Sequence, residues 1–242
     1  MLNIDICFFI ILKSLTIYGI ILPMEYKYEL HCHTGCVSRC GRVEPEEIVK
    51  LYKNEGYNGI VVTDHYSPMT FKPNWCPQKQ IDFYLSGYRR MKAAAGNDFT
   101  VLLGIELRHY GTANDYLIYG IDEDFLYNAG NLMTVMEKHV YQLAHSRGYL
   151  VYQAHPFRVG MRRCNPDYID GVEVYNGKTD LKANTKALEW AKANNKLMVS
   201  GSDFHVVKNL ARGGIITDKP INNNSELLEV LKKQNFRRLE RY

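Results

Sequence analysis

Short apolar segments alternate with amphipathic segments along the chain from residue 25 onward. The apolar segments are typical of buried strands, as in 58–63 (NGIVVT), which is rich in β-branched residues and carries no charge. The amphipathic segments carry helix signals, such as Pro45 at a start and Gly56 at a stop. Repeated strand–helix units predict a parallel sheet covered by helices. We expect strands at 26–32, 58–63, 100–105, 115–119, 149–153, 171–174, 197–200 and 215–217, and helices at 45–55, 78–95, 132–147, 181–194 and 225–234.

Length and composition favour one folded domain. The 242 residues are 46% hydrophobic and 23% charged, which excludes a disordered chain, a collagen-like chain and a polytopic membrane protein. An α/β barrel commonly takes roughly 200–250 residues, and no linker rich in Pro, Gly or Ser divides the chain. We therefore expect one closed or nearly closed α/β barrel over residues 25–242.

Charge and cysteine content narrow the functional classes. The chain has 30 Lys and Arg against 26 Asp and Glu, a net charge of +4, and no long basic run. This charge pattern does not indicate nucleic-acid binding. The cysteines include no CxxC pair and do not resemble a disulfide framework, so we interpret them as reduced thiols of a cytoplasmic protein. There are six of them: Cys7, Cys32, Cys36, Cys40, Cys76 and Cys164.

The N-terminal segment 6–22 is almost entirely apolar, but it fits a targeting signal poorly. Asp5 precedes it, no basic residue does, and Lys13 interrupts it, so it is a poor signal peptide and a short membrane span. We interpret residues 1–24 as an extension outside the fold that arises from an upstream start codon before Met24. A weak membrane anchor and a packed element of the domain are the alternatives. No stable membrane association is expected.

Side chains of the kinds that bind metals follow five of the expected strands. The carboxyl ends of the strands in a parallel barrel open on one face, where active sites are built. Isolated examples of such residues are usually structural, but five strand ends together favour a shared site. The residues are His31 and His33, Asp64 and His65, Glu106, His155, and Asp203 and His205.

Spacing supports a metal site at that face. Residues i and i+2 of a strand point to the same side, so His31 and His33 can reach one ion together, as can Asp203 and His205. Cys32 then points into the packing. Imidazole and carboxylate mixtures suit Zn²⁺, Mn²⁺ or Fe. The donors exceed the needs of one ion, which predicts two or three divalent ions.

These motifs, in this order, resemble those of the PHP family, named for its polymerase and histidinol-phosphatase members. The resemblance runs from about residue 28 to 212. It implies a single distorted seven-stranded (β/α) TIM-like barrel and a stand-alone metal-dependent phosphoesterase with up to three ions. The matching motifs are HCHT at 31–34, VTDH at 62–65, GIE at 104–106, AHP at 154–156, GVEVYN at 171–176 and GSDFH at 201–205.

The resemblance implies a role for each position. His31, His33, Glu106 and Asp203 are similar to ligands of a first ion. Glu106 and His155 resemble ligands of a second ion, with Glu106 as a bridge, while His65 and His205 resemble ligands of a third. Asp64 occupies a catalytic position that more often orients a ligand than binds an ion itself.

Two positions depart from the family pattern. Members commonly have an acidic residue or His seven or eight positions after the first His, whereas this loop reads SRCG at 38–41. Either Cys40 substitutes, or the third site is weak, or Arg39 takes over the charge. Many members also have a further His about ten residues after the motif Glu. Asp115 lies in that region, so either Asp115 serves or the second ion has one protein ligand fewer.

The expected chemistry is hydrolysis of phosphate esters by a metal-activated hydroxide that attacks phosphorus in line. His205 or His65 would protonate the leaving alcohol. Arginine suits recognition of phosphate. Arg158 is the first candidate for that role, followed by Arg39 and Arg42 and then Arg212.

The substrate class stays open. A small phosphomonoester similar to histidinol phosphate or a nucleotide is the preferred hypothesis. A nuclease acting on single-stranded ends and a non-catalytic metal-binding module are the alternatives. We expect His109, His139 and His145 to be surface or packing residues, and the loop that carries Phe71 and Trp75 to form a lid or a substrate wall.

Overall fold

The computed structural model of the chain describes residues 16–17, 20–21 and 24–242. Two short strands, β1 (Thr16–Ile17) and β2 (Ile20–Ile21), pair antiparallel with each other. Most of segment 1–24, for which we expect an extension, lies outside the described residues. Within them, no helix is both long and apolar enough to cross a bilayer.

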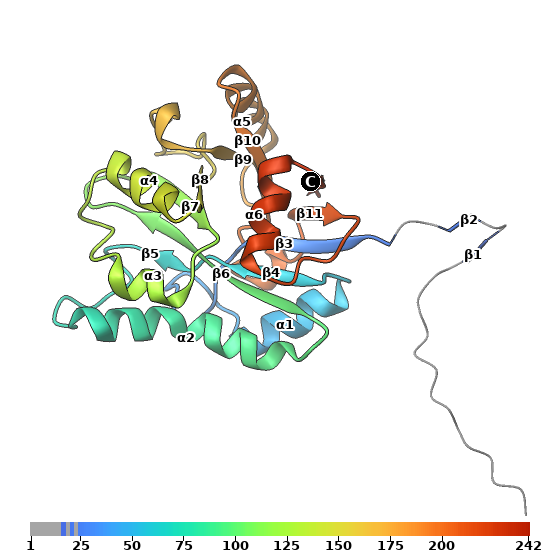
Figure 1. Cartoon of the computed structure of the whole chain (residues 1–242), viewed down its shortest axis with the longest axis horizontal. Coiled ribbons are helices and arrows are strands. Elements are labelled where there is room, and N and C mark those ends of the chain that lie inside the picture. The colour runs from blue at the N-terminus through green and yellow to red at the C-terminus, as the bar shows by residue number, and fades with distance from the viewer. Residues whose placement is uncertain (1–15, 18–19, 22–23) are drawn as a thin grey trace, which may run out of the picture.

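The strands form a curved sheet that closes on itself into a distorted barrel (Figure 1). The strand order is β10-β9-β8-β7-β6-β4-β3, and β3 continues through β11 to β12. The two ends of the barrel meet at Phe204, whose backbone N–H donates to the carbonyl of His31 (3.0 Å) and whose carbonyl accepts from the N–H of His33 (3.0 Å). The expectation of a nearly closed α/β barrel is confirmed. The strands are β3 (Tyr26–Cys32), β4 (Gly59–Val62), β5 (His65–Tyr66), β6 (Thr100–Arg108), β7 (Asp115–Tyr119), β8 (Leu150–Gln153), β9 (Gly171–Asn176), β10 (Leu197–Gly201), β11 (Gly213–Thr217) and β12 (Arg237–Glu240).

The expectation that the sheet is parallel is wrong for two strands. β7 runs antiparallel to both β6 and β8, and β11 runs antiparallel to β3 and β12. Residues 109–114 join β6 to β7 without a helix, and a link that short can only form a hairpin, because a parallel return needs a crossover of a dozen or more residues. The short strands β5 and β12 were not expected from the sequence.

Helices cover the outside of the barrel, and α1 and α2 lie side by side below β4 and β6 in Figure 1. The expected helix at 132–147 is shorter than its pattern suggests, because residues 131–134 form a turn. A helix capped by Asp122 precedes it and was not expected. The helices are α1 (Pro45–Asn54), α2 (Pro77–Ala95), α3 (Glu123–Asn128), α4 (Glu137–Ser146), α5 (Leu181–Ala193) and α6 (Asn224–Lys233), with short 3-10 turns at Pro166–Tyr168 and Val207–Asn209.

Two apolar layers hold this arrangement. Alternate residues of β3, Tyr28 and Leu30, pack inside the barrel, where Leu227 and Leu231 of α6 join them. The opposite faces of the strands pack against the helices, and Cys32 belongs to this outer layer, as its place between His31 and His33 predicts. Burying each large side chain contributes roughly 1.5–3 kcal/mol. One end of the barrel is therefore filled with apolar side chains, and the polar strand ends gather at the other.

Candidate metal centre

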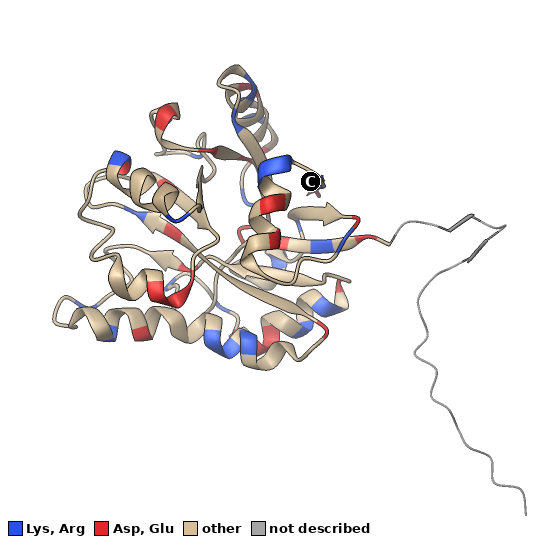
Figure 2. Ribbon diagram, viewed as in Figure 1, with Lys and Arg blue, Asp and Glu red and all other residues tan. Residues whose placement is uncertain are grey.

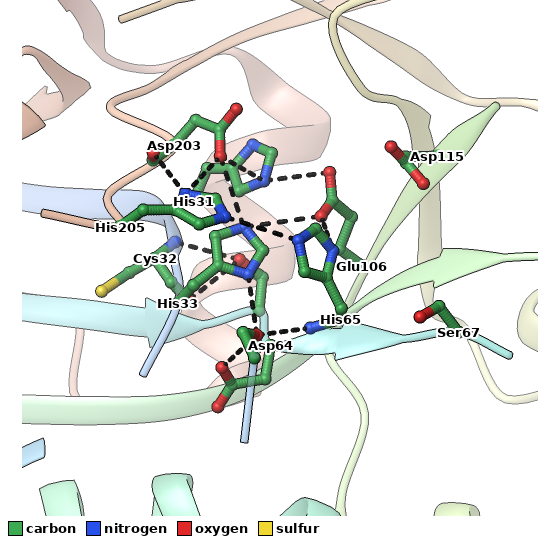
Figure 3. A network of polar contacts seen from close by, with 12 residues as sticks. His31, Cys32, His33, Asp64, His65, Ser67, Glu106, Asp115, Asp203 and His205 are labelled. Atoms are coloured by element: carbon green, nitrogen blue, oxygen red, sulfur yellow. Dashed lines mark hydrogen bonds and ion pairs between the residues drawn. The ribbon is translucent and has the colours of Figure 1, made fainter. Parts of the chain in front are cut away.

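The predicted ligand residues come together at one end of the barrel, as Figure 3 shows for those on β3, β5, β6 and the loop after β10. All are buried except His65, whose side chain is 22% exposed. Their ligand atoms form three overlapping groups, and within each group the atoms lie within 4.8 Å of one another. The groups are His31, His33 and Asp203; His31, Glu106 and His155; and His33, His65 and His205.

The carboxylate of Glu106 lies between these groups. Its Oε1 is 3.1 Å from Nε2 of His31 and 3.0 Å from Nε2 of His155. Its Oε2 is 3.4 Å from Nε2 of His33 and 2.6 Å from Nδ1 of His65. A carboxylate with each oxygen facing a different pair of imidazoles has the geometry of a bridge between two ions.

A bulge in β3 turns both of its histidines into the barrel. Glu29 and Cys32 are three positions apart, but their partners on β4, Ile60 and Val62, are only two positions apart, so β3 has one extra residue. Inside the bulge, the Glu29 carboxylate accepts from the backbone N–H groups of Leu30 (3.0 Å) and His31 (2.9 Å). In a regular strand neighbouring side chains point to opposite faces. The extra residue interrupts this alternation, so Leu30 and His31 both point into the barrel.

The same carboxylate connects β3 to the loop after β10. Glu29 also accepts from the N–H of Ser202 (2.8 Å), next to Asp203. Asp203 has a positive φ of 53°, and His155 one of 30°. Residues other than glycine rarely adopt this region and do so mainly where surrounding contacts enforce it, often at functional sites. The backbone at both positions is thus held in place by the site.

Hydrogen bonds at Nδ1 fix the orientation of two histidines. Nδ1 of His31 lies 2.8 Å from Oε1 of Glu173, a carboxylate acceptor. Nδ1 of His33 lies 3.2 Å from Oγ of Ser38, which itself donates to Asp64 (2.6 Å) and so acts as an acceptor toward the ring. Both rings therefore carry their proton on Nδ1. Their Nε2 lone pairs point into the site, buried and without a hydrogen-bonding partner.

The unpartnered Nε2 atoms of His31 and His33 show whether the residues of this site suit a metal ion. Buried polar atoms are nearly always satisfied, so an orphaned acceptor calls for an explanation such as an ion. Imidazole nitrogen and carboxylate oxygen are donors that Zn²⁺, Mn²⁺ and Fe accept. The residues present therefore fit divalent cations.

Electrostatics support the same conclusion. Although burial acts to raise it, the charges of His31 and His65 hold the pKa of Glu106 well below its usual range. Burial acts to lower the pKa of His31, but Glu173, Asp203 and Glu106 raise it well above its usual value. In the same way Glu106 outweighs burial and raises the pKa of His65 to about 10. The carboxylates therefore favour positive charge at the site, which is the charge that a bound cation supplies.

Asp64 lies behind the ligand groups rather than among them. Its carboxylate accepts from the backbone N–H of Thr34 (2.7 Å), from the Thr34 hydroxyl (2.7 Å) and from Ser38. Burial outweighs these bonds and raises the pKa of Asp64 to about 6. The contact with Ser38, and through it with His33, is that of a group that orients a ligand.

Of the four predicted arginines, the structure brings one into contact with a predicted ligand. The guanidinium of Arg158 pairs with Asp203 and donates to Oδ1 of Asn176 (2.8 Å), and its side chain is 27% exposed. Arg39 lies at the rim, where it helps line a hollow. Arg42 and Arg212 direct their guanidinium groups at backbone carbonyls, those of Arg39 (3.3 Å) and Gly177 (3.2 Å) respectively.

The hollow has a volume of about 290 Å³ and adjoins the ligand groups at His65. Met69 and Thr70 from the loop after β5 line part of it, whereas Phe71 and Trp75 pack against Tyr66 and Phe83. A larger groove of about 920 Å³ lies elsewhere, between β11 and α6. The residues that line the hollow are Arg39, Cys40, His65, Ser67, Met69, Thr70 and Arg108.

Three functional neighbours carried no assigned role in the sequence analysis. Glu173 orients His31, and Gly201 leaves room for it, since a Cβ there would lie 2.5 Å from Cβ of His31. Lys178 places Nζ 3.1 Å from Nδ1 of His205 and 3.5 Å from Oδ1 of Asp203. Lys178 follows directly on the GVEVYN motif and its Gly177, but its type alone gives no sign of this contact.

The remaining histidines lie apart from the ligand groups. His109 packs in a T-shaped contact with Tyr116, His139 is exposed on α4, and His145 pairs with Asp170 (2.7 Å). Asp115 lies 3.8 Å from Nε2 of His155 and is paired with the guanidinium of Arg108 (2.5 Å). Asp115 therefore lies beside the group of His31, Glu106 and His155, and its carboxylate is in an ion pair with Arg108.

Comparisons with known proteins agree with this fold. A family model described as PHP-associated matches residues 182–236. The structure is similar to PsfC from Pseudomonas syringae PB-5123, with a TM-score of 0.64 and 15% identity over 84% of this chain and 88% of PsfC. It is also similar to a proposed metal-dependent phosphoesterase from Bifidobacterium adolescentis, with a TM-score of 0.52 and 15% identity over 85% and 96% of the two chains.

A third similar structure is the lesion-specific endonuclease PfuEndoQ from Pyrococcus furiosus, with a TM-score of 0.56 and 17% identity. The match covers 87% of this chain but only 56% of the endonuclease. None of the curated protein sequences matches the chain. At these identities the similarities establish a shared fold.

Proposed function

We propose that this chain hydrolyses phosphate esters with two or three bound divalent cations. Its ordered motifs, its fold and its match over residues 182–236 support membership of the PHP family. The observation that carries the proposal is the convergence of buried, unpartnered Nε2 atoms of His31 and His33 on the carboxylates of Glu106 and Asp203. An arrangement that only stabilised the fold would satisfy these nitrogens.

The donor groups support an assignment of residues to ions. His31, His33 and Asp203 would hold one ion, and Glu106 with His155 a second, with Asp115 beside it. Bound there, such ions polarise a phosphoryl oxygen and lower the pKa of water toward 7, which supplies the nucleophile for in-line attack. Asp64, through Ser38, keeps Nε2 of His33 available, and Glu173 does so for His31.

Two cations next to the site suit the substrate phosphate. Arg158 and Lys178 both reach Asp203, and their side chains are 27% and 31% exposed, so a phosphate entering the site can contact them. Arg158 offers paired N–H groups that match phosphate geometry. Arg39, at the rim of the hollow, is a further contact for the part of the substrate beyond the phosphorus atom.

The leaving alcohol needs a proton. His65 or His205 would donate it if two ions were bound, since neither ring belongs to the two groups assigned to those ions, and His65 lines the hollow. If a third ion were bound, both rings would serve as its ligands instead. The size of the hollow, about 290 Å³, suits a small leaving group, which favours a phosphomonoester such as histidinol phosphate or a nucleotide.

A nuclease is the second candidate, because a structurally similar protein is an endonuclease. Figure 2 shows basic and acidic segments interspersed over the helices, which gives this alternative no support from charge. A non-catalytic metal-binding module is the third candidate.

The reduced thiols expected of a cytoplasmic protein agree with the free state of the cysteines at 32, 36, 40, 76 and 164.

The test pairs metal analysis with a substrate panel. The purified chain is stripped with a chelator, reloaded with Zn²⁺, Mn²⁺ or Fe²⁺, and assayed on phosphomonoesters, phosphodiesters and short oligonucleotides. We expect more than one metal equivalent per chain and hydrolysis of monoesters. His33→Ala should lose both metal and hydrolysis, and His139→Ala, an exposed control on α4, should lose neither.

The other outcomes discriminate between the candidates. Hydrolysis confined to diesters or oligonucleotides favours the nuclease. Bound metal without hydrolysis of any substrate favours the non-catalytic module. Full hydrolysis by metal-free protein refutes the proposed function.

A further inference from the structure

The hollow beside His65 is the space that the alcohol half of a substrate would occupy, because it adjoins the ligand groups. It is lined by residues of the loop after β3, of β5 and the loop after it, and of the end of β6. Two arginines, Arg39 and Arg108, belong to this wall. Among the residues that the structure describes, no aspartate or glutamate lines it. The charge of the wall therefore bears on which alcohols the site accepts.

Arg108 is held in place by an ion pair on one side of its guanidinium. Its Nε and Nη2 donate to the two carboxylate oxygens of Asp115 (2.6 and 2.5 Å). The Asp115 side chain is 1% exposed, whereas that of Arg108 is 26% exposed. Nη1 of Arg108 donates to no other residue in the part of the chain that the structure describes. Asp115 thus balances the charge of Arg108 from below, and the remaining N–H groups are available to a ligand in the hollow.

Arg39 supplies a charge that no carboxylate balances. It is exposed, and within residues 24–242 its guanidinium forms no ion pair. The loop that carries it is anchored beside the ligand groups. The N–H of Gly41 donates to the carbonyl of Ser38 (2.8 Å), and the N–H of Arg42 donates to that of His205 (2.8 Å). This loop therefore keeps a positive charge at the rim of the hollow.

The approach of this loop depends on glycine. A Cβ on Gly41 would lie 2.5 Å from the carbonyl oxygen of Thr34, so a larger residue would push the loop away. Arg39 contributes no ion pair to the fold, and its position at the rim is nevertheless well defined. A guanidinium with these properties is suited to a ligand that enters the hollow.

We propose that Arg39 and Arg108 select substrates whose alcohol half carries a second anionic group, a carboxylate or a phosphate, which binds in the hollow. The paired N–H groups of arginine match the oxygens of both groups. A cationic alcohol would instead meet the unbalanced charge of Arg39 and be repelled. The inference rests on the proposed function and narrows it. It disfavours histidinol phosphate, whose alcohol is cationic, and it requires a further anion on a nucleotide substrate.

The test compares four benzyl phosphates that differ only in the group opposite the ester: carboxylate, phosphonate, methyl or aminomethyl. The methylene between the ring and the ester oxygen keeps the reactivity of the leaving alcohol nearly constant. With the full chain reloaded with metal, we expect kcat/KM to be roughly 10- to 100-fold higher for an anionic ester than for the methyl ester, as hydrogen bonds to charged groups contribute on this scale. The aminomethyl ester should fall below the methyl ester. Whether carboxylate or phosphonate gives the higher value identifies the second anion.

Variants locate the preference in the hollow. The readout is the ratio of kcat/KM for the anionic ester to that for the methyl ester, in which losses common to all esters cancel. Arg39→Gln should lower this ratio about tenfold. Arg108→Lys, which keeps a charge beside Asp115 but loses the paired N–H groups, should lower it as well. Lys72→Gln is the matched control, since its exposed Nζ lies over the Trp75 ring (5.5 Å) outside the hollow, and it should keep the wild-type ratio.

The outcomes separate this inference from the proposed function. Equal kcat/KM values for the anionic and methyl esters, a preference for the aminomethyl ester, or a ratio that Arg39→Gln leaves unchanged overturns the inference while hydrolysis itself stands. If none of the esters is hydrolysed, the proposed function fails. Calorimetric dissociation constants of the four esters then decide the inference, which predicts tighter binding of an anionic ester and requires Arg39 for it.

Discussion

Glu173→Gln removes the charge that orients His31 while keeping the size of the side chain. The Glu173 carboxylate accepts from Nδ1 of His31 (2.8 Å), from the backbone N–H of His155 (3.1 Å) and from Nδ2 of Asn176 (2.9 Å). It is 1% exposed, so water cannot replace these contacts. A glutamine has one acceptor oxygen for three donors.

Both orientations of the new amide are costly. If its oxygen faces His31, its NH₂ group meets the donors of His155 and Asn176, and Asn176 retains only Asp203 as a carboxylate partner (3.2 Å). If its NH₂ group faces His31, the ring must move its proton to Nε2, and the lone pair is lost. Leaving a buried donor unsatisfied costs about 1–3 kcal/mol, and removing a group that orients a metal-binding histidine lowers metal affinity roughly 10- to 100-fold.

Competition with a chromophoric chelator measures the predicted loss of affinity. We expect Zn²⁺ affinity of the tightest site to fall 10- to 100-fold, equivalent to about 1.4–2.8 kcal/mol. Glu189→Gln, an exposed carboxylate on α5, is the matched control and should bind as the wild type does. Wild-type affinity in Glu173→Gln would refute the argument that this carboxylate sets the His31 tautomer.

Three other predictions follow from the same geometry. Gly201→Ala places a Cβ 2.5 Å from Cβ of His31 and 2.7 Å from Oε1 of Glu173, so thermal unfolding should report a loss of about 1–3 kcal/mol together with a loss of bound metal; an unchanged melting temperature would contradict it. In metal-free protein the pKa of His65 is raised to about 10, so its stabilising contribution is complete below about pH 6.5 and is lost as pH rises to about 10. The free energy of unfolding should therefore fall over that range more steeply in the wild type than in His65→Gln, and equal slopes would count against this assignment. Arg158→Lys should lower kcat/KM for a phosphomonoester roughly 10- to 100-fold, because charged hydrogen bonds contribute about 1.5–3 kcal/mol, while metal content stays unchanged; an unaltered kcat/KM would remove Arg158 from the phosphate site.

The repeating strand and helix pattern predicted the barrel, because strand segments such as 58–63 are buried and strongly β-branched. The pattern alone does not give the reversal of β7, but the short connection between the expected strands at 100–105 and 115–119 does, because a parallel return needs about a dozen residues or more. A strand's direction depends on the length of its connection, and the sequence pattern of β7 is the same for both directions. The strands β5 and β12 have two and four residues, too few for a periodic signal.

The placement of the candidate ligands at strand ends was accessible from the sequence, since parallel strands open on one face. The contacts that orient these ligands could not be predicted from the sequence. The i, i+2 spacing of His31 and His33 suggested a regular strand, whereas a bulge at Glu29 sets their direction. Glu173 lies 142 residues from His31, and its contact depends on how β9 and β10 pack. Spacing along the chain carries no information about such contacts.

The most direct test of the central claim is anomalous diffraction from crystals of the metal-loaded protein, measured on both sides of the metal absorption edge. The proposed centre predicts one ion among His31, His33 and Asp203 and another between Glu106 and His155. Ordered side chains with no anomalous density at these positions, or ions bound only elsewhere, such as at His145 and Asp170, would contradict the account.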